Sequence, residues 1–159
     1  MKRALKVFAA LSFAVYAFAL VSVLFVYSRG HFDDLTLTDY IRYSSNIIPF
    51  RSISLYIGAL FDSSMNIETP ILNLFGNLLM FLPMGLYLPY FFRGLRRFGR
   101  FCICMAAALL VIEAAQLLLR AGSFDIDDVI LNIAGAFAGF GIWKVLVRIT
   151  CKRGITEKE

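Results

Sequence analysis

The sequence predicts an all-α integral membrane protein, a bundle of four transmembrane helices with an outer amphipathic helical segment between the first and second. Of the 159 residues, 60% are hydrophobic and 17% are charged, against usual shares of about 50% and about 25%. Long uncharged stretches recur, and a chain of this length allows about one domain. This composition excludes a secreted disulfide scaffold, a disordered tail and a nucleic-acid-binding module.

The predicted spans cover residues 5–27, 71–92, 101–119 and 129–149. Each is close to the length that crosses the hydrocarbon core, about 20 residues. The first stretch also fits a signal peptide, because a basic start precedes an apolar run with a small-x-small site at residues 17–19. Its apolar run continues unbroken to Tyr27, and this length favours a span.

The charged residues that flank these spans separate by sign. Eight acidic residues lie in the opposite loops: Asp33, Asp34, Asp39, Asp62, Glu68, Asp125, Asp127 and Asp128. Most basic residues lie on the other side: Lys2, Arg3, Lys6, Arg93, Arg96, Arg97, Arg100, Lys144, Arg148, Lys152, Arg153 and Lys158. Basic residues beside short loops stay in the cytoplasm. We therefore expect a multi-pass protein with both termini cytoplasmic, and we assign the net charge of +5 to topology rather than to nucleic acid.

The outer segment, residues 28–69, contains apolar residues at helical spacing: Ile53, Tyr56, Ile57, Leu60 and Phe61. This pattern predicts an amphipathic helix that lies in the outer headgroup layer or caps the bundle. A lid over an outward-facing site is the alternative. Thr69 and Pro70 read as the N-cap and first residue of the next helix.

Polar side chains are costly inside a bilayer, so each needs a partner or a function. They occur at helical spacing near the outer ends of three spans: Asn73 and Asn77 on the second, Glu113, Gln116 and Arg120 on the third, Asp128 and Asn132 on the fourth. We expect these faces to converge on a cavity open to the exterior. Gly135 and Gly139 extend the stripe on the fourth span and predict close helix packing.

Structural interpretations of the same residues stay open. The amides can hydrogen-bond across the bundle, and Asp125 with Asp128 can cap the fourth helix. Alternatively, Glu113, Asp125, Asp127 and Asp128 form a carboxylate cluster for a divalent cation, although their spacing matches no strong metal motif. Arg51 and Arg120 suit either an anionic headgroup or nearby acids.

No cofactor is expected apart from that cation. His31 is the only histidine, and no Cys and His spacing matches a zinc site. Cys102 and Cys104 point to different faces of one helix and, with Cys151, lie toward the reducing side. We therefore expect no structural disulfide.

Four motifs occur in a specific order: NIIPF at 46–50, NLLMFLPMGLYLP at 77–89, the Glu113 to Gln116 pair, and FDIDDVILNIAGAFAGF at 124–140. Together they resemble the VanZ-like family of small bacterial membrane proteins. The motif residues are Asn46, Pro49, Phe50, Asn77, Pro83, Gly85, Glu113, Gln116, Asp125, Asp128, Asn132 and Gly135. Many members have an Arg closer to the Asp motif than Arg120 is here.

The resemblance implies a single VanZ-like membrane domain over residues 1–159, with a motif-bearing core of about 46–140 and the outer loop 28–69. It also implies the bacterial cytoplasmic membrane and a family named for low-level resistance to the lipoglycopeptide teicoplanin. No established catalytic residue transfers from the family.

Three functions compete. The first is a non-enzymatic protein that binds an anionic lipid-linked cell-wall precursor or a lipoglycopeptide in the outer pocket, with membrane lipids as further partners. Its candidate pocket residues are Asn46, Arg51, Asn73, Asn77, Glu113, Gln116, Arg120, Asp125, Asp128 and Asn132. The second is a lipid-modifying enzyme with Glu113 as acid or base and a metal on the Asp motif. The third is a transporter. It is ranked last because the internal repeat that is typical of transporters is not visible in the sequence.

Overall fold

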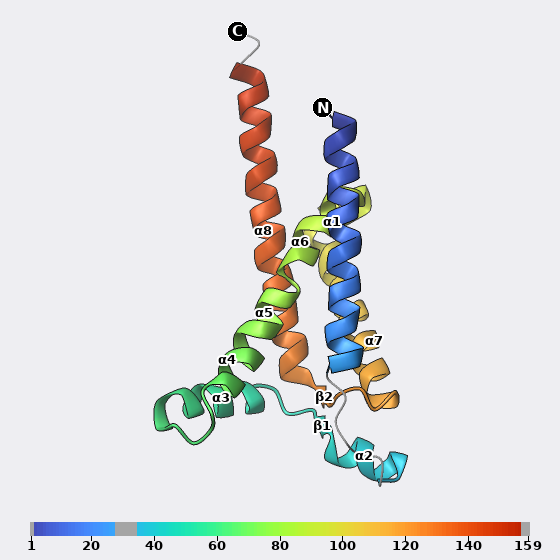
Figure 1. Cartoon of the computed structure of the whole chain (residues 1–159). Helices are drawn as coiled ribbons and strands as arrows, with labels where there is room; N and C mark the ends of the chain where they lie inside the picture. Colours follow the sequence, from blue (N-terminus) through green and yellow to red (C-terminus); the bar gives the residue numbers. More distant parts are fainter. Residues whose placement is uncertain (1, 28–34, 157–159) are drawn as a thin grey trace. The chain divides into compact units, whose positions relative to one another are not determined.

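The computed structural model describes the backbone of residues 2–27 and 35–156, and the side chains of residues 3–26 and 35–150. The described chain is helical almost throughout (Figure 1). It divides into two compact units: unit 1 comprises residues 1–47 and 111–125, and unit 2 comprises residues 48–110 and 126–159. The predicted loop residues His31, Asp33 and Asp34 and the side chain of Cys151 lie outside the described ranges.

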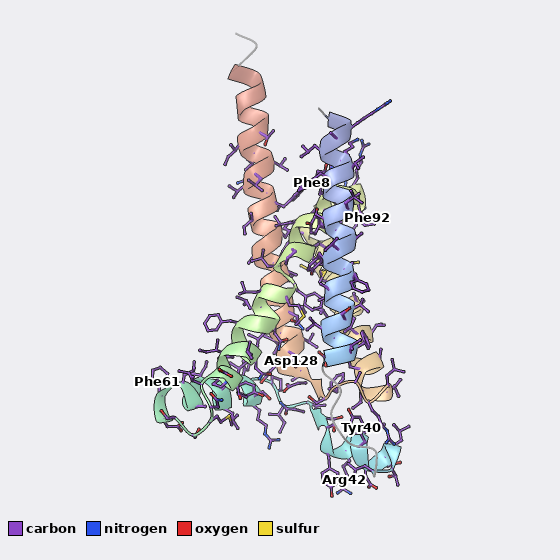
Figure 2. The ribbon with its side chains drawn as sticks, in the orientation of Figure 1. Phe8, Tyr40, Arg42, Phe61, Phe92 and Asp128 are labelled. Atoms are coloured by element: carbon purple, nitrogen blue, oxygen red, sulfur yellow. The ribbon has the colours of Figure 1, made fainter. Side chains whose placement is uncertain are left out.

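Within the described ranges, four helices are long and apolar enough to cross a membrane: Arg3–Val26, Glu68–Phe91, Phe98–Leu118 and Ile126–Thr150. Each overlaps one of the predicted spans. The predicted all-α fold with four membrane-spanning helices is therefore confirmed. Many of the apolar side chains on these helices are exposed, as Phe8 on the first illustrates (Figure 2), and such surfaces suit contact with acyl chains.

Unit 1 contains the first span and the short elements that follow it. These are α1 (Lys2–Ser22), η1 (Val23–Tyr27), α2 (Leu37–Tyr43), β1 (Ser45–Asn46), the last part of α7 (Phe98–Leu118) and β2 (Phe124–Asp125). The Thr36 hydroxyl accepts the Asp39 backbone N–H at 3.2 Å and so caps α2. β1 and β2 pair in parallel, with Ser45 opposite Phe124 and Asn46 opposite Asp125.

Unit 2 contains the predicted amphipathic helix, the second span and the fourth. Its elements are α3 (Arg51–Asp62), α4 (Glu68–Ile71), η2 (Leu72–Gly76), α5 (Asn77–Met80), α6 (Leu82–Phe91), η3 (Arg93–Arg96), the first part of α7, and α8 (Ile126–Thr156). Helix α3 coincides with the predicted amphipathic helix. Phe61 at its end is 86% exposed and points away from the ribbon (Figure 2).

The second span is a series of short helical segments, α4, η2, α5 and α6, rather than one uniform helix. Pro83 lies at the start of α6 and Pro89 within it. Proline has no backbone N–H and clashes with the preceding turn, so it interrupts the helical hydrogen-bond ladder. The residue that separates α5 from α6, Phe81, is 1% exposed and stays in the helical region of backbone conformation.

The predicted start of this span was wrong by two residues. The helix begins at Glu68, so Thr69 and Pro70 lie inside its first turn and Thr69 is not the N-cap. Asn66 satisfies the helix start instead, because its side chain accepts the Glu68 N–H at 3.2 Å and its carbonyl accepts the Thr69 N–H at 2.9 Å. Pro70 is tolerated there because N–H groups of a first turn have no partner within the helix.

Helix α8 packs against α5 and α6 through glycines (Figure 1). A Cβ on Gly135 would fall on the Leu78 carbonyl oxygen, and one on Gly139 would fall on the Leu82 carbonyl oxygen. Gly85 of α6 makes the reciprocal approach to Ala136 of α8. The predicted small-residue contact on α8 is therefore confirmed, and it lets the backbones touch.

We predict that Gly135→Ala lowers the thermal unfolding midpoint of the purified protein, at a cost of about 1–3 kcal/mol, because the added methyl forces α5 and α8 apart. Gly141→Ala is the matched control, since no atom lies within 4 Å of a Cβ at that exposed position on the same helix. The control should be neutral or stabilising by up to about 1 kcal/mol through helix propensity. Equal midpoints for the two variants would contradict this packing.

Candidate functional site

The Asp-rich motif lies at the start of α8, where Asp127 and Asp128 occupy the first turn. The N-terminal end of a helix carries partial positive charge, so acids there are stabilised. Helix α8 begins directly after Asp125. Each of these three carboxylates has a different protein partner.

Asp127 holds the start of α3 in unit 2. Its Oδ1 accepts the Phe50 N–H at 2.6 Å and its Oδ2 accepts the Ile53 N–H at 3.0 Å. The side chain is 1% exposed. Phe50 has a left-handed backbone with φ of 65° and supplies no side-chain cap for α3. A bulky residue is strained in that conformation, so the buried carboxylate both caps α3 and stabilises the strained turn before it.

Asp128 joins the fourth span to the second. The Asn77 side-chain N–H, on α5, donates to Asp128 Oδ1 at 2.5 Å. The label in Figure 2 places Asp128 near the start of α8. A hydrogen bond to a carboxylate is stronger than one between neutral groups, so this contact fixes α5 against α8 about two turns before Gly135, where the glycine contacts begin.

Asn132 follows Asp128 by one turn on the same helix and is 3% exposed. Its Oδ1 has no hydrogen-bond partner among the residues that the structure describes. Buried polar atoms are almost always hydrogen-bonded, because an unsatisfied one costs about 1–3 kcal/mol. Gly135 on the next turn lies against α5, so Asn132 belongs to the face of α8 that carries Asp128 and the glycines.

Glu113 lies in unit 1 and is 4% exposed. Its Oε2 accepts the backbone N–H of Asp125 at 3.3 Å. Asp125 in turn accepts the Asn46 side-chain N–H through Oδ1 at 3.0 Å, beside the β1–β2 pair that also brings these two residues together. Glu113, Asp125 and Asn46 thus form one connected cluster in unit 1.

Gln116 and Arg120 fasten unit 1 internally. Gln116 is 7% exposed and its Nε2 donates to the Leu24 carbonyl at 2.9 Å, in the π-helical turn η1. Arg120 Nη2 donates to the Leu35 carbonyl at 2.9 Å, and its guanidinium carbon lies 5.8 Å from the centre of the Tyr40 ring. These contacts tie the end of α7 to η1 and to the segment that leads into α2.

Helix α7 ends in a Schellman-type turn. The Ala121 N–H donates to the Gln116 carbonyl at 2.8 Å and the Arg120 N–H donates to the Leu117 carbonyl at 3.2 Å. The left-handed position, φ of 51°, is held by Arg120 rather than by glycine. That conformation costs a non-glycine residue about 1–2 kcal/mol, which the Leu35 hydrogen bond and the Tyr40 contact offset.

The remaining two candidates, Asn73 and Arg51, are not hydrogen-bonded to the polar sets of either unit among the residues that the structure describes. Asn73 Nδ2 donates to the Thr69 carbonyl at 2.8 Å, one turn earlier on its own helix. Arg51 is exposed at the first position of α3. Arg51 is thus a charged candidate with an exposed side chain.

The structure therefore brings the predicted residues together as two sets. Unit 1 joins Asn46, Glu113 and Asp125, and unit 2 joins Asn77 with Asp128 one turn from Asn132. The prediction that Glu113 shares a cavity with Asn77 and Asn132 connects the two units and stays a prediction. Among the described residues, no three His, Cys, Asp or Glu side chains are grouped as metal ligands.

Two important residues were missed by sequence reasoning. Asp127 was considered only as a metal candidate, whereas it caps α3. Tyr40 is fully buried and its hydroxyl donates to the Gly122 carbonyl at 2.6 Å. A signal existed for the first: α3 begins after Pro49 and Phe50, which cannot cap a helix, so a distant residue had to supply the cap.

Comparison with known proteins agrees with the sequence motifs. A family model described as VanZ/LLP1 matches residues 13–148. The match includes all the motif residues from Asn46 to Gly135, and it confirms the resemblance noted in the sequence. No curated protein and no solved structure matches the chain.

We predict that Asp127→Asn destabilises the protein by about 1–3 kcal/mol, because the new amide presents an N–H to one of the two backbone donors. The thermal unfolding midpoint and the hydrogen exchange of residues 50–54 would measure this effect. Asp62→Asn is the control at the opposite end of α3. Hydrogen bonds from the Ser64 hydroxyl and backbone lower the pKa of exposed Asp62, so this variant also removes a charge.

The control should leave both measurements almost unchanged, since its carboxylate is accessible to water. Asp127→Asn with a wild-type midpoint and wild-type exchange at the start of α3 would show that the cap is dispensable.

Proposed function

The chain belongs to the VanZ/LLP1 family, and from this premise we propose that it binds an anionic lipid-linked cell-envelope molecule or a lipoglycopeptide, without catalysing a reaction. The family membership and the four apolar helices make it a multi-pass membrane protein. We place the binding residues at the acidic and amide-bearing ends of the spans, which the charge distribution assigns to the exterior. Low-level resistance to teicoplanin-type antibiotics would follow from this binding.

The observation that carries the proposal is the buried Oδ1 of Asn132, which has no hydrogen-bond partner within the described part of the chain. A buried acceptor without a donor destabilises the folded protein, and inside a membrane span no bulk water is present to donate a hydrogen bond to it. A ligand that donates an O–H or N–H would remove the cost. Cell-wall precursors and lipoglycopeptides both carry many sugar hydroxyls and peptide amides.

Other polar residues of unit 2 support the same ligand class. The Asn77 and Asp128 pair lies one turn from Asn132 and adds further hydrogen-bonding oxygens. Arg51, exposed at the first turn of α3, offers a guanidinium to a phosphate or carboxylate. An amphiphile with an anionic group and several donors matches these side chains better than a simple ion does.

The arrangement of the carboxylates favours binding over catalysis. Glu113 and Asp127 are both buried, and each accepts backbone N–H groups that help to hold an element in place. A general acid or base needs to reach the proton that it transfers. The alternative, a lipid-modifying enzyme with Glu113 as acid or base and a divalent cation on the Asp motif, remains distinguishable by experiment.

We predict that Asn132→Leu raises or preserves the thermal unfolding midpoint while it weakens ligand binding. Leucine has a similar volume and removes a buried acceptor that costs about 1–3 kcal/mol. The binding assay would titrate teicoplanin, and separately a short-chain lipid-linked disaccharide peptide, into protein in nanodiscs. Loss of one hydrogen bond should weaken affinity about tenfold.

Growth of a teicoplanin-susceptible host that expresses either chain gives a second measurement. The variant should lose the increase in inhibitory concentration that the wild type confers. A destabilised Asn132→Leu protein would mean that the amide is structural. A wild type that binds neither probe would contradict the proposed function itself.

The Glu113→Gln variant separates binding from catalysis. Glutamine keeps an oxygen that accepts the Asp125 N–H, so a binding protein should retain most of its affinity and resistance, within about tenfold. An enzyme that depends on proton transfer should lose activity by about 100-fold or more. Retained ligand affinity together with complete loss of resistance would favour the enzyme.

A further inference from the structure

One end of unit 2 is rich in exposed basic side chains. It comprises η3, the start of α7 and the middle of α8, and we name it the basic end; its members are Arg93, Arg96, Arg97, Arg100, Lys144 and Arg148. No acidic residue occurs in residues 69–112 or 129–156, the stretches that contain it. The sequence around the basic end therefore supplies no carboxylate to neutralise it.

Arg96 is held in place rather than extended into solvent. Its Nε donates to the Pro89 carbonyl at 3.0 Å, and its guanidinium carbon lies 5.9 Å from the centre of the Trp143 ring on α8. These contacts use one edge and one face of the guanidinium. The two terminal nitrogens belong to an exposed side chain and retain the paired N–H geometry that suits a phosphate.

Lys144, which follows Trp143 on α8, is held in a similar way. Its ammonium lies 5.0 Å from the centre of the Phe140 ring and 5.9 Å from that of Phe98. The aromatic rings attract the cation and limit its motion. Because the Phe140 and Trp143 rings are themselves in contact, with centroids 5.6 Å apart, the cations beside them, Arg96 and the Lys144 ammonium, belong to one surface of α8 and η3.

We propose that the basic end binds the headgroup phosphodiester of an anionic phospholipid. Basic pockets between membrane-spanning helices recognise such headgroups on the cytoplasmic side, and Trp is enriched at the same depth. Exposed apolar side chains flank the basic residues: Phe92 is 54% exposed, Val145 is 52% exposed and Leu146 is 54% exposed. Acyl chains would contact these side chains, whereas a free phosphate has nothing to place there.

Topology alone does not account for this arrangement. The positive-inside rule requires basic residues near the ends of the spans but sets no geometry for them. Here two of the cations are held over aromatic rings, and one is also hydrogen-bonded to a backbone carbonyl. Ordering a long side chain costs conformational entropy. Because these cations are already ordered, a headgroup that binds them does not incur that entropy cost, and its affinity is higher.

The test uses Trp143, which is the only tryptophan of the chain and the ring against which Arg96 lies. Full-length protein is reconstituted in phosphatidylcholine nanodiscs that contain increasing fractions of brominated phosphatidylglycerol or brominated phosphatidylcholine. Bromine in the acyl chains quenches nearby tryptophan fluorescence. Wild-type protein should prefer phosphatidylglycerol by about fivefold or more, the effect expected for one basic residue near a membrane surface.

Lys144→Gln should reduce this preference to near unity while the Arg96 contact with Trp143 stays intact. Arg96→Gln should do the same. Arg42→Gln is the matched control, because Arg42 is exposed on α2 of unit 1 and loses the same charge (Figure 2). Quenching by brominated phosphatidylcholine should be equal in all four proteins, which verifies that each is folded and inserted. Nanodiscs expose both faces, so the result does not depend on orientation.

An inorganic phosphate titration distinguishes a lipid from a free anion. Phosphate should reduce the phosphatidylglycerol preference no more than chloride does at the same ionic strength. Specific displacement by phosphate would overturn the lipid assignment. So would equal quenching by the two brominated lipids in the wild type, or a loss of preference in Arg42→Gln as large as in Lys144→Gln. None of these outcomes bears on Asn132, so the proposed function stands or fails separately.

Discussion

The structure depends on one constraint: a buried polar group at membrane depth must find its hydrogen bonds within the protein. Gln116 donates to a carbonyl of η1, Asn77 donates to Asp128, and Asp127 accepts two backbone N–H groups of the turn before α3 and its first residues. In each case the polar residue joins two segments that are far apart in sequence. These polar side chains thus connect η1 to α7, α5 to α8, and the start of α3 to α8.

The segment from Asp125 to Asp128 illustrates how compactly this is done. Asp125 pairs with Asn46 in unit 1, whereas Asp127 holds α3 and Asp128 holds α5 in unit 2. Consecutive helical residues point in different directions, so acids at these spacings reach different neighbours. In the sequence these acids are spaced closely enough to suggest a cation-binding cluster. Among the described residues, each of them instead holds a different neighbour.

Features that depend on residues close together in the sequence were predictable, whereas features that depend on distant residues were not. The four spans and α3 were predictable because hydropathy and helical spacing are properties of neighbouring residues. The contact of Gly135 with α5 was predictable in kind, since small residues at i and i+4 favour close packing. The role of Asp127 was not, because its partners lie 77 and 74 residues away. The misplaced start of the second span had a local cause, Asn66, which competes with Thr69 as a cap.

Helix α8 carries two kinds of polar group: charged residues whose positions general electrostatic effects explain, and residues whose positions they do not explain. Its acids lie in the first turn, as the helix dipole favours, and its first basic residue, Lys144, lies far along the helix, as the positive-inside rule would require if that end were cytoplasmic. Those two effects act on charge alone, so they account for the presence of Asp128 and Lys144. They do not account for Asn132, which is neutral and buried and whose acceptor has no partner among the described residues. Nor do they account for the fixed placement of Arg96 over Trp143, and these two features are therefore the ones that point beyond the fold.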